Sequence, residues 1–342
     1  MKKNQRISEG IDMGVGFSLM AMIILILIPV LGVYAGGEYM LGVVLPYGAF
    51  ALFVLGVIYR IGVWARSPVP FRIPTTCGQQ KTLSWIRPNG IENPTSALGV
   101  WLRMAGEIFL FRSLFRNTKL KLTEKRAMVT IWEKWLWLAA IIFHWSFLII
   151  ILRHLRFVTG EVPVLVRLLD GLDGFFSFGM FSFYLTDLLI VGALGFLLIR
   201  RLVIPMVRYV SFAADYFPLF LILGIGLSGI LMKYFLRADV TAVKELALGL
   251  VTFHPAIPGE VGLIFYVHLF LVCVLLAYFP FSKLMHGPGL LLTPTRNMAN
   301  NNRMARHVNP WNYPVHVHTY EEYEDEFRKI MQGAGLPLEK EG

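Results

Sequence analysis

Four histidines, two on each of two apolar stretches, are the residues of this sequence best suited to chemistry. His144 and His154 lie ten residues apart in one stretch, and His268 and His286 lie eighteen residues apart at the two ends of another. Neutral imidazole is a common ligand of haem iron, and an ionisable side chain in an apolar stretch is a functional candidate by default. Because a bis-histidine b haem takes one histidine from each side, this set predicts two haems b. Packing within a helix bundle is the alternative role.

The elements that must carry these histidines are membrane-spanning helices. Apolar residues make up 56% of the 342 residues and charged residues 16%, against ~25% charged in an average soluble domain. A spanning helix needs ~20 consecutive apolar residues, and six stretches meet this need. We therefore expect an all-α integral membrane protein with about six transmembrane helices, at about Val15–Val33, Leu41–Val63, Trp135–Leu152, Phe181–Ile199, Phe212–Phe235 and Leu263–Phe281.

The distribution of positive charge predicts how these helices are oriented. With a cytoplasmic N-terminus, 26 of the 32 Lys and Arg residues lie in segments at the inner side, as the positive-inside rule requires. An even number of helices then leaves both termini cytoplasmic in a multi-pass protein of the cytoplasmic membrane. The lipid bilayer thus accounts for the net charge of +10, and no nucleic-acid partner is expected.

Topology also predicts which histidines pair. The third stretch would run outward and the sixth inward, so His144 and His286 lie near the inner surface, and His154 and His268 near the outer surface. The two haems are therefore expected between helices 3 and 6. Along straight helices the histidines would be ~15 Å apart on helix 3 and ~27 Å apart on helix 6, where they would share one face. A tilt, or a break at Pro280, must absorb this difference of ~12 Å.

The chain divides into four expected parts. Residues 1–64 form an N-terminal transmembrane hairpin, 65–134 a cytoplasmic insert, 135–287 the dihaem domain and 288–342 a cytoplasmic tail. Two cysteines are too few and too far apart for an iron–sulfur motif, so any such centre would belong to another subunit.

The insert and the tail each contain one candidate helix. Ala97–Phe115 mixes arginines with aromatic residues, which predicts a helix lying at the inner membrane surface; a seventh span is the alternative. Tyr320–Gln332 has an acidic start and a basic end, which suits the dipole of a short helix.

The histidine spacing resembles that of the membrane gamma subunit of respiratory nitrate reductases, over roughly residues 130–290. In that family the first histidine pairs with the last and the second with the third, and one helix precedes the histidine-bearing pair. Here two helices and the insert precede it. Three further strings look like those of DsrM, the cytochrome b subunit of the membrane complex associated with dissimilatory sulfite reduction: Phe71–Gln80, Leu110–Thr118 and Asn309–Pro314.

This second resemblance implies an electron-transfer subunit of a quinol-linked oxidoreductase complex in sulfur respiration. Such a subunit binds two haems b and takes electrons from menaquinol. It passes them to a cytoplasmic iron–sulfur subunit related to heterodisulfide reductase, alongside further periplasmic and membrane subunits. Two alternatives remain: a gamma-type cytochrome b of another reductase (nitrate or heterodisulfide), and a haem-free membrane anchor or transporter.

Two further sites follow from these implications. A docking platform for the partner is expected around Thr75–Gln80, with Cys77, and around Trp311–Tyr313 in the tail. Cys77 has a small apolar contact as its alternative role. A quinol site is expected near the outer haem, as in the nitrate reductase family, so that protons leave outward. Charge is nearly absent from the six apolar cores except for Asp187 and Lys233, and the candidates for this site are Arg153, Asp170, Asp173, Lys233, His254 and Glu260.

Overall fold

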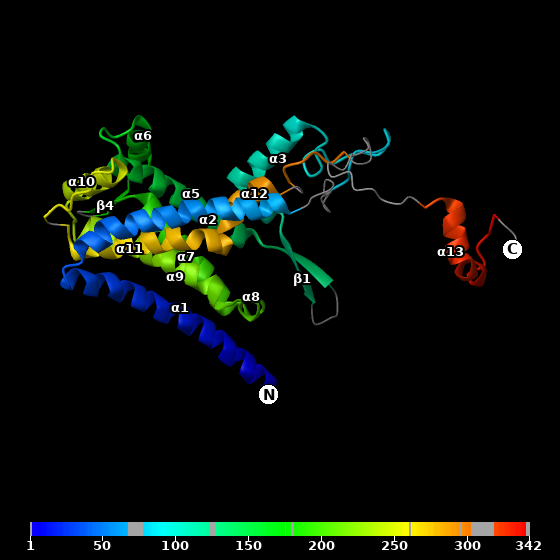
Figure 1. The fold of residues 1–342 in the computed structure, drawn as a ribbon, viewed down its shortest axis with the longest axis horizontal. Coiled ribbons are helices and arrows are strands. Elements are labelled where there is room, and N and C mark those ends of the chain that lie inside the picture. The colour runs from blue at the N-terminus through cyan, green and yellow to red at the C-terminus, as the bar shows by residue number, and fades with distance from the viewer. Residues whose placement is uncertain are drawn as a thin grey trace.

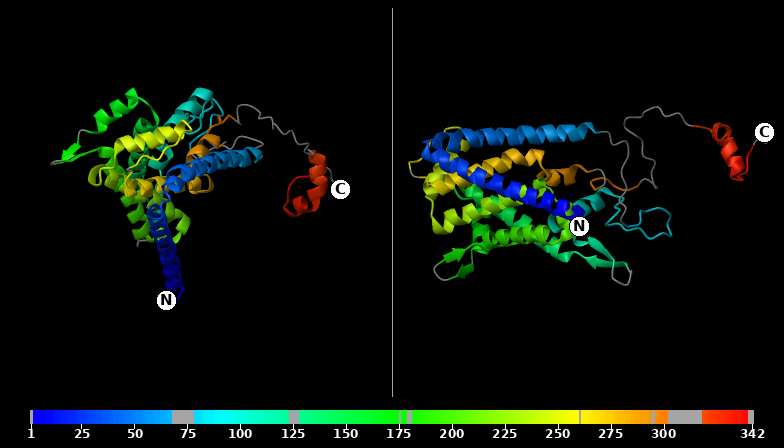
Figure 2. Two further views of the ribbon diagram at one scale, coloured as in Figure 1. Left: turned by 60° about the vertical axis from the view of Figure 1, so that its left-hand side comes forward. Right: turned by 90° about the horizontal axis from the view of Figure 1, so that it is seen from below.

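A computed structural model describes residues 2–67, 78–122, 128–174, 176–178, 181–259, 261–293, 296–301 and 318–339. The described part is mostly helical, and its long helices pack as a bundle with their axes roughly side by side (Figure 1). Short elements gather at the two ends of this bundle (Figure 2). We name the ends by the histidine pair that lies nearer, as the His144 end and the His154 end.

Five helices of the described part are long and apolar enough to cross a membrane, which confirms a multi-pass helical membrane protein. Short irregular helices extend three of them. The segment η1 (Met40–Val44) leads into the second helix, η2 (Leu231–Phe235) continues the fourth, and η3 (Phe279–Phe281) continues the fifth. The five are α1 (Lys2–Tyr34), α2 (Leu45–Arg66), α5 (Lys134–Val158), α9 (Ala213–Ile230) and α11 (Leu263–Tyr278).

The remaining predicted span begins later than expected. Helix α7 (Leu185–Val203) packs against α5 and α9 within the bundle. It carries Asp187, Arg200 and Arg201, so the count of six spans stays a prediction. The predicted start at Phe181 is wrong, because Phe176–Phe178 (β3) and Phe181–Phe183 (β4) pair as an antiparallel hairpin.

The last predicted membrane-spanning helix is interrupted at Pro280, between two histidines that were expected on one helix. After α11 the chain continues through η3, η4 (Lys283–Met285) and α12 (His286–Leu292). A proline lacks the backbone N–H and its ring clashes with the preceding helical turn. His286 therefore opens a new helix, and the expectation that it shares a helix face with His268 is wrong. Of the two expected alternatives, a tilt or a break at Pro280, the structure contains the break.

Helix α2 approaches this break at Gly56. A Cβ atom added there would lie 2.7 Å from the Cβ atom of Pro280. We expect Gly56→Leu to push α2 away from the break and to lower the free energy of unfolding by about 1–3 kcal/mol, measured by thermal unfolding in detergent. Gly48→Leu is the matched control on α2, because nothing lies within 4 Å of its added Cβ. Equal unfolding midpoints for the two variants would contradict the tight contact.

The insert differs from the single interfacial helix that the sequence predicts. Helix α3 (Ala97–Leu110) ends where Phe111 adopts a left-handed backbone with φ of 47°, and α4 (Arg112–Phe115) follows. The strands β1 (Thr118–Leu122) and β2 (Met128–Trp132) then form an antiparallel hairpin. The insert and the hairpin β3–β4 thus add small β elements to a fold predicted as all-α.

The first residues of the tail pack on the insert. The backbone N–H of Asn300 donates to the carbonyl of Pro94 at 2.7 Å, and its side chain donates to Oδ1 of Asn93 at 2.6 Å. Arg296 forms an ion pair with Glu107 at 2.8 Å. Asn93, Glu107 and Asn300 are buried, so residues 296–301 belong structurally with the insert.

Farther along the tail, the predicted helix is confirmed as α13 (Tyr320–Gly333). Thr319 caps it, because its hydroxyl oxygen accepts a hydrogen bond from the Glu322 backbone N–H and its own backbone N–H donates to Oε2 of Glu322, which is the capping-box arrangement. Cys77 and the expected platform around Trp311–Tyr313 lie outside the described residues.

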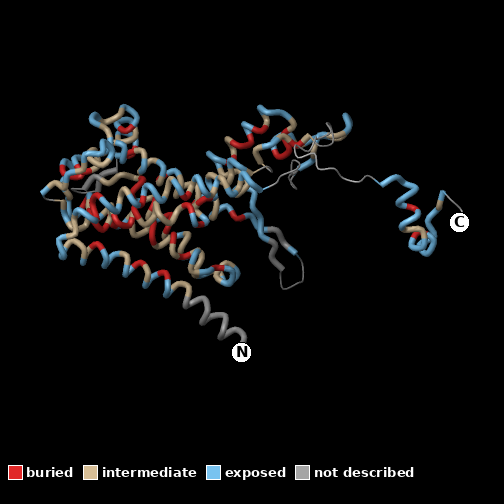
Figure 3. The backbone as a smooth tube through the Cα atoms, in the orientation of Figure 1, coloured by how far each residue is buried: buried red, intermediate tan, exposed pale blue. Residues whose placement is uncertain are grey.

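The segments between predicted spans at the His154 end contain helices that the sequence did not predict. These are α6 (Val164–Asp173) and α10 (Val240–Val251), whereas α8 (Pro205–Tyr209) lies at the opposite end (Figure 1). Buried residues gather where the helices meet, and the residues on the outward sides of α2 and of the described part of α1 are largely exposed (Figure 3). Exposed apolar side chains along long helices are expected where lipid is the solvent.

Candidate functional site

The two histidines near the β3–β4 end of the bundle meet between α5 and α11. The ring centroids of His154 and His268 are 6.4 Å apart, and the ring planes differ by 10°. A Cβ atom added at Gly229 on α9 would lie 3.3 Å from Cε1 of His268, so a side chain at this position would crowd the ring. The structure therefore brings together the pair that topology predicts at this end.

The other two histidines meet at the opposite end of the bundle. The ring centroids of His144 on α5 and His286 on α12 are 5.8 Å apart, and their planes are nearly perpendicular, at 87°. This contact depends on the break at Pro280, because the chain turns away from the axis of α11 after the break and places His286 beside His144 on α5.

Each of the four rings is held through Nδ1. In His144, His154 and His286 this nitrogen lies 2.7, 2.7 and 3.0 Å from the carbonyl oxygens of Ala140, Ile150 and Lys283. In His268 it lies 3.0 Å from Oγ of Ser228. Within the described part of the chain, Nε2 of these rings has no hydrogen-bond partner. A hydrogen bond from one ring nitrogen commonly fixes a histidine that binds metal through the other.

The pairs fit haem iron. Two imidazoles that bind one metal atom from opposite sides, through nitrogens ~2 Å from it, have ring centroids about 6 Å apart. No group of three or more His, Cys, Asp or Glu side chains among the described residues could hold a metal ion. Paired histidines without further protein ligands suit an iron whose other four ligands come from a porphyrin.

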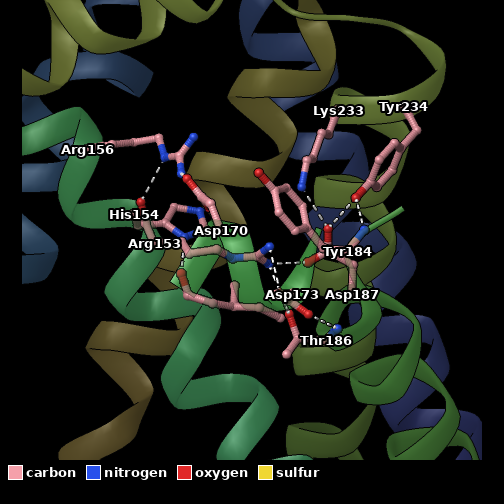
Figure 4. Close-up of polar contacts among 11 residues, drawn as sticks. Arg153, His154, Arg156, Asp170, Asp173, Tyr184, Thr186, Asp187, Lys233 and Tyr234 are labelled. Carbon is pink, nitrogen blue, oxygen red and sulfur yellow. Dashed lines mark hydrogen bonds and ion pairs between the residues drawn. The ribbon is translucent and has the colours of Figure 1, made fainter. Parts of the chain in front are cut away.

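A buried charged network lies beside His154 and includes the neighbouring residue Arg153 (Figure 4). The Arg153 guanidinium lies 2.6 Å from Oδ1 of Asp187, 2.9 Å from Oδ2 of Asp173 and 3.1 Å from Oγ1 of Thr186. All four side chains are buried. Because a buried charge without a partner is strongly destabilising, Arg153 and the two carboxylates stabilise one another as a set.

Asp187 also binds two consecutive residues of η2. Its Oδ2 accepts hydrogen bonds from Nζ of Lys233 at 2.9 Å and from the hydroxyl of Tyr234 at 2.8 Å. A π-helix has a wide turn and is often found at functional sites. Here the π-helix η2 lets the consecutive residues Lys233 and Tyr234 reach the same oxygen of Asp187. The Lys233 ammonium also lies 3.5 Å from the ring centroid of Tyr184, a cation–π contact.

The network contains most of the predicted quinol-site candidates. Arg153, Asp173 and Lys233 belong to it directly, and Asp170 lies at its edge in an ion pair with Arg156. His254 is not part of it, since its Nδ1 bonds locally to the carbonyl of Thr252 at 2.7 Å. Glu260 lies outside the described residues.

Sequence reasoning missed the residue at the middle of the network. Asp187 was visible only as a charge in an apolar stretch, and Tyr184, Thr186 and Tyr234 gave no signal. That unusual charge was the one sign that could have nominated Asp187.

Comparison with known proteins bears on the same region. The sequence pattern of the nitrate reductase gamma subunit matches residues 103–307, which include all four histidines and the charged network. A relative from Archaeoglobus fulgidus is 46% identical over 280 residues, covering 79% of this chain and 82% of its own length. Another from Archaeoglobus profundus is 43% identical over 274 residues, covering 78% and 81%. Both carry the name Hdr-like menaquinol oxidoreductase cytochrome b-like subunit.

Proposed function

This chain belongs to the nitrate reductase gamma subunit family, and we propose that it is a dihaem membrane cytochrome b that oxidises menaquinol. The observation that carries the proposal is the pair of histidine contacts, with ring centroids 6.4 and 5.8 Å apart at opposite ends of one bundle. The names of the two relatives support the link to menaquinol and to a cytochrome b.

In this proposal His154 and His268 hold one haem, and His144 and His286 hold the other. Bound there, the haems would supply two one-electron carriers in line across the membrane. The protein's own contribution is orientation, because the hydrogen bonds to Ala140, Ile150, Lys283 and Ser228 fix each ring and leave Nε2 for the metal.

Menaquinol would bind at the edge of the charged network, beside His154. Oxidation of a quinol releases protons as well as electrons, so the site needs an acceptor within hydrogen-bond reach of the quinol hydroxyl. Asp187 is the proposed acceptor. Its Oδ1 is held from the buried side by Arg153, and its Oδ2 lies 2.9 Å from Nζ of Lys233, whose side chain is 39% exposed, so the quinol hydroxyl would approach Oδ2 beside Lys233. Lys233 would hold the quinol oxygen by a hydrogen bond.

The insert and the tail are the proposed binding surface for a cytoplasmic iron–sulfur subunit related to heterodisulfide reductase. The prefix Hdr-like in the relatives' names supports this class of partner. The described residues of the insert and the start of the tail, residues 296–301, lie at the His144 end, which would face the cytoplasm with both termini. Electrons would then move from the His154 end to the His144 end. Protons would be released at the His154 end, on the side of the membrane opposite the cytoplasm.

The finer assignment is to the DsrM group, within a larger complex with periplasmic and membrane subunits. It rests on the strings Phe71–Gln80, Leu110–Thr118 and Asn309–Pro314. Co-purification of a nitrate-reducing molybdenum subunit instead of an iron–sulfur subunit would point to the alternative, a gamma subunit of another reductase.

A reduced-minus-oxidised spectrum of the purified protein tests the proposed function. We expect two b-type haems per chain, both reduced by a menaquinol analogue. A spectrum without b-type bands would identify the chain as a haem-free anchor or transporter and overturn the proposal.

Partner binding can be separated from haem binding by truncation. A cut after Pro288 would remove Arg296 and Asn300, which would leave Glu107 and Asn93 of the insert without these buried contacts. We therefore expect a chain ending at Asn301 to keep both haems and the packed insert while losing the iron–sulfur partner, measured by co-purification and haem content.

A matched control for this truncation ends at Glu339 and keeps α13. It should retain the partner. Normal assembly of the chain ending at Asn301 would show that residues 302–342 are not needed for docking.

A further inference from the structure

We propose that Phe111 is a positioning residue that sets the plane of the His144 ring, and with it the perpendicular arrangement of the His144–His286 pair. The inference rests on the proposed function, because it assumes that this pair binds a haem. The ring centroids of Phe111 and His144 lie 4.9 Å apart in an edge-to-face contact. Such aromatic contacts favour one relative orientation of the two rings.

The backbone at Phe111 is the first argument. Its φ of 47° lies in the left-handed region, which glycine adopts without steric conflict and a bulky residue disfavours. Glycine is also the usual residue just after a helix end with this backbone conformation, and the N–H of Phe111 donates to the carbonyl of Gly106 at the end of α3. The contact of the Phe111 ring with His144 offsets the steric cost of the left-handed backbone at this position.

The second argument is how firmly this segment is held against α5. Indole N–H groups of Trp137 and Trp145 donate to the carbonyls of Leu110 and Phe109 at 2.8 and 3.1 Å, and that of Trp132 donates to the carbonyl of Phe115. Carbonyls in the last turn of a helix lack partners within the helix. The tryptophans supply them and hold the α3–α4 break over His144.

The tail holds the same break from its other side. Arg296 lies 2.8 Å from Oε1 of Glu107, before the break, and 2.6 Å from Oγ of Ser113, after it. The backbone N–H of Ser113 donates to Oε2 of Glu107 at 3.0 Å. Phe111 is thus placed by contacts on both sides, and its ring meets His144 in a defined orientation.

The ring then constrains His144 in a way that its hydrogen bond does not. The bond from Nδ1 to Ala140 selects the nitrogen that faces the metal. The rings of Phe111 and Phe143, at 4.9 and 4.8 Å, both meet His144 edge to face. Together they favour the plane that lies at 87° to the ring of His286, in contrast to 10° in the other pair.

Electron paramagnetic resonance of the oxidised protein reads out this geometry. Low-spin haems with perpendicular axial imidazoles give a larger maximum g value than those with parallel imidazoles. We expect two distinct signals, and we expect Phe111→Gly to lower the maximum g value of the His144–His286 haem and to leave the other signal unchanged. Glycine suits the backbone at this position, so the variant removes the ring while keeping the turn.

Phe109→Leu is the matched control. Phe109 lies in the same segment and stacks on Trp145 with centroids 6.1 Å apart, but it has no ring contact with His144 among the described residues. It should leave both signals unchanged. Two normal signals in Phe111→Gly would overturn the inference and leave the proposed function intact, whereas absence of b-type haem from the unmodified protein would overturn the proposed function itself.

Discussion

Alanine at His154 or at His268 is expected to remove one and the same haem, and alanine at His144 or at His286 the other. Each pair spans two helices, with ring centroids 6.4 and 5.8 Å apart. A b haem has no covalent bond to the protein, so loss of either axial ligand leaves it held from one side only. Each single variant should therefore lose about half of the haem, measured as haem per chain with the spectrum of the haem that remains.

His254→Ala is the matched control for these four variants. His254 is exposed, and its ring nitrogen Nδ1 bonds to Thr252 in its own loop, so its removal should leave both haems in place. The spectra should sort the four variants into two groups of two. The pairing would be wrong if His144→Ala and His268→Ala lost the same haem and the other two variants lost the second.

The contact within each pair of histidines could be predicted from the sequence, because it needs only the direction in which each helix runs. Because the predicted third and sixth helices run in opposite directions, the first of the four histidines meets the last, and the second meets the third. The level of each pair could not be predicted from helix geometry alone. Pro280 ends α11, and the following short helices carry His286 to α5 along a path that no helical period describes.

The irregular elements were also harder to predict, because tertiary contacts and not local helix geometry set their conformation. The break at Phe111 has no glycine or proline to mark it, and tertiary contacts with three tryptophans of β2 and α5 hold it. The helices α6 and α10 lie in segments too short and too mixed in character to suggest a span. Local propensity is a weak guide where tertiary contacts decide the conformation.

The charged network shows how far site prediction from the sequence could reach. Arg153, Asp173 and Lys233 were candidates because all three were expected at one end of the bundle. Asp187, which binds both Arg153 and Lys233, was not a candidate, because an aspartate near the start of an apolar stretch has no local sign of its neighbours. Only the packing of α5, α6, α7 and η2 makes it the residue that links Arg153 to Lys233.

Asparagine at Asp187 is expected to slow reduction of the haems by menaquinol about 100-fold, the lower range for loss of a general base. The amide keeps the size of the carboxylate but cannot take a proton from the quinol. Reduction by dithionite needs no such acceptor in the protein, so its extent should not change. The measurement is stopped-flow haem reduction with each reductant, together with haem content.

Two further variants keep this last prediction decisive. Asp187→Asn leaves the positive charge of Lys233 without its carboxylate, which can destabilise the fold, so the double variant Asp187→Asn with Lys233→Met removes both charges and should be equally slow. Asp215→Asn is the matched control at the His144 end, where Lys283 and Arg201 lie 2.7 and 3.8 Å from the carboxylate. It removes a carboxylate held by two cations, as Asp187 is, but far from the proposed quinol site. If Asp215→Asn slows quinol-driven reduction while both Asp187 variants reduce normally, menaquinol is oxidised at the opposite end of the bundle.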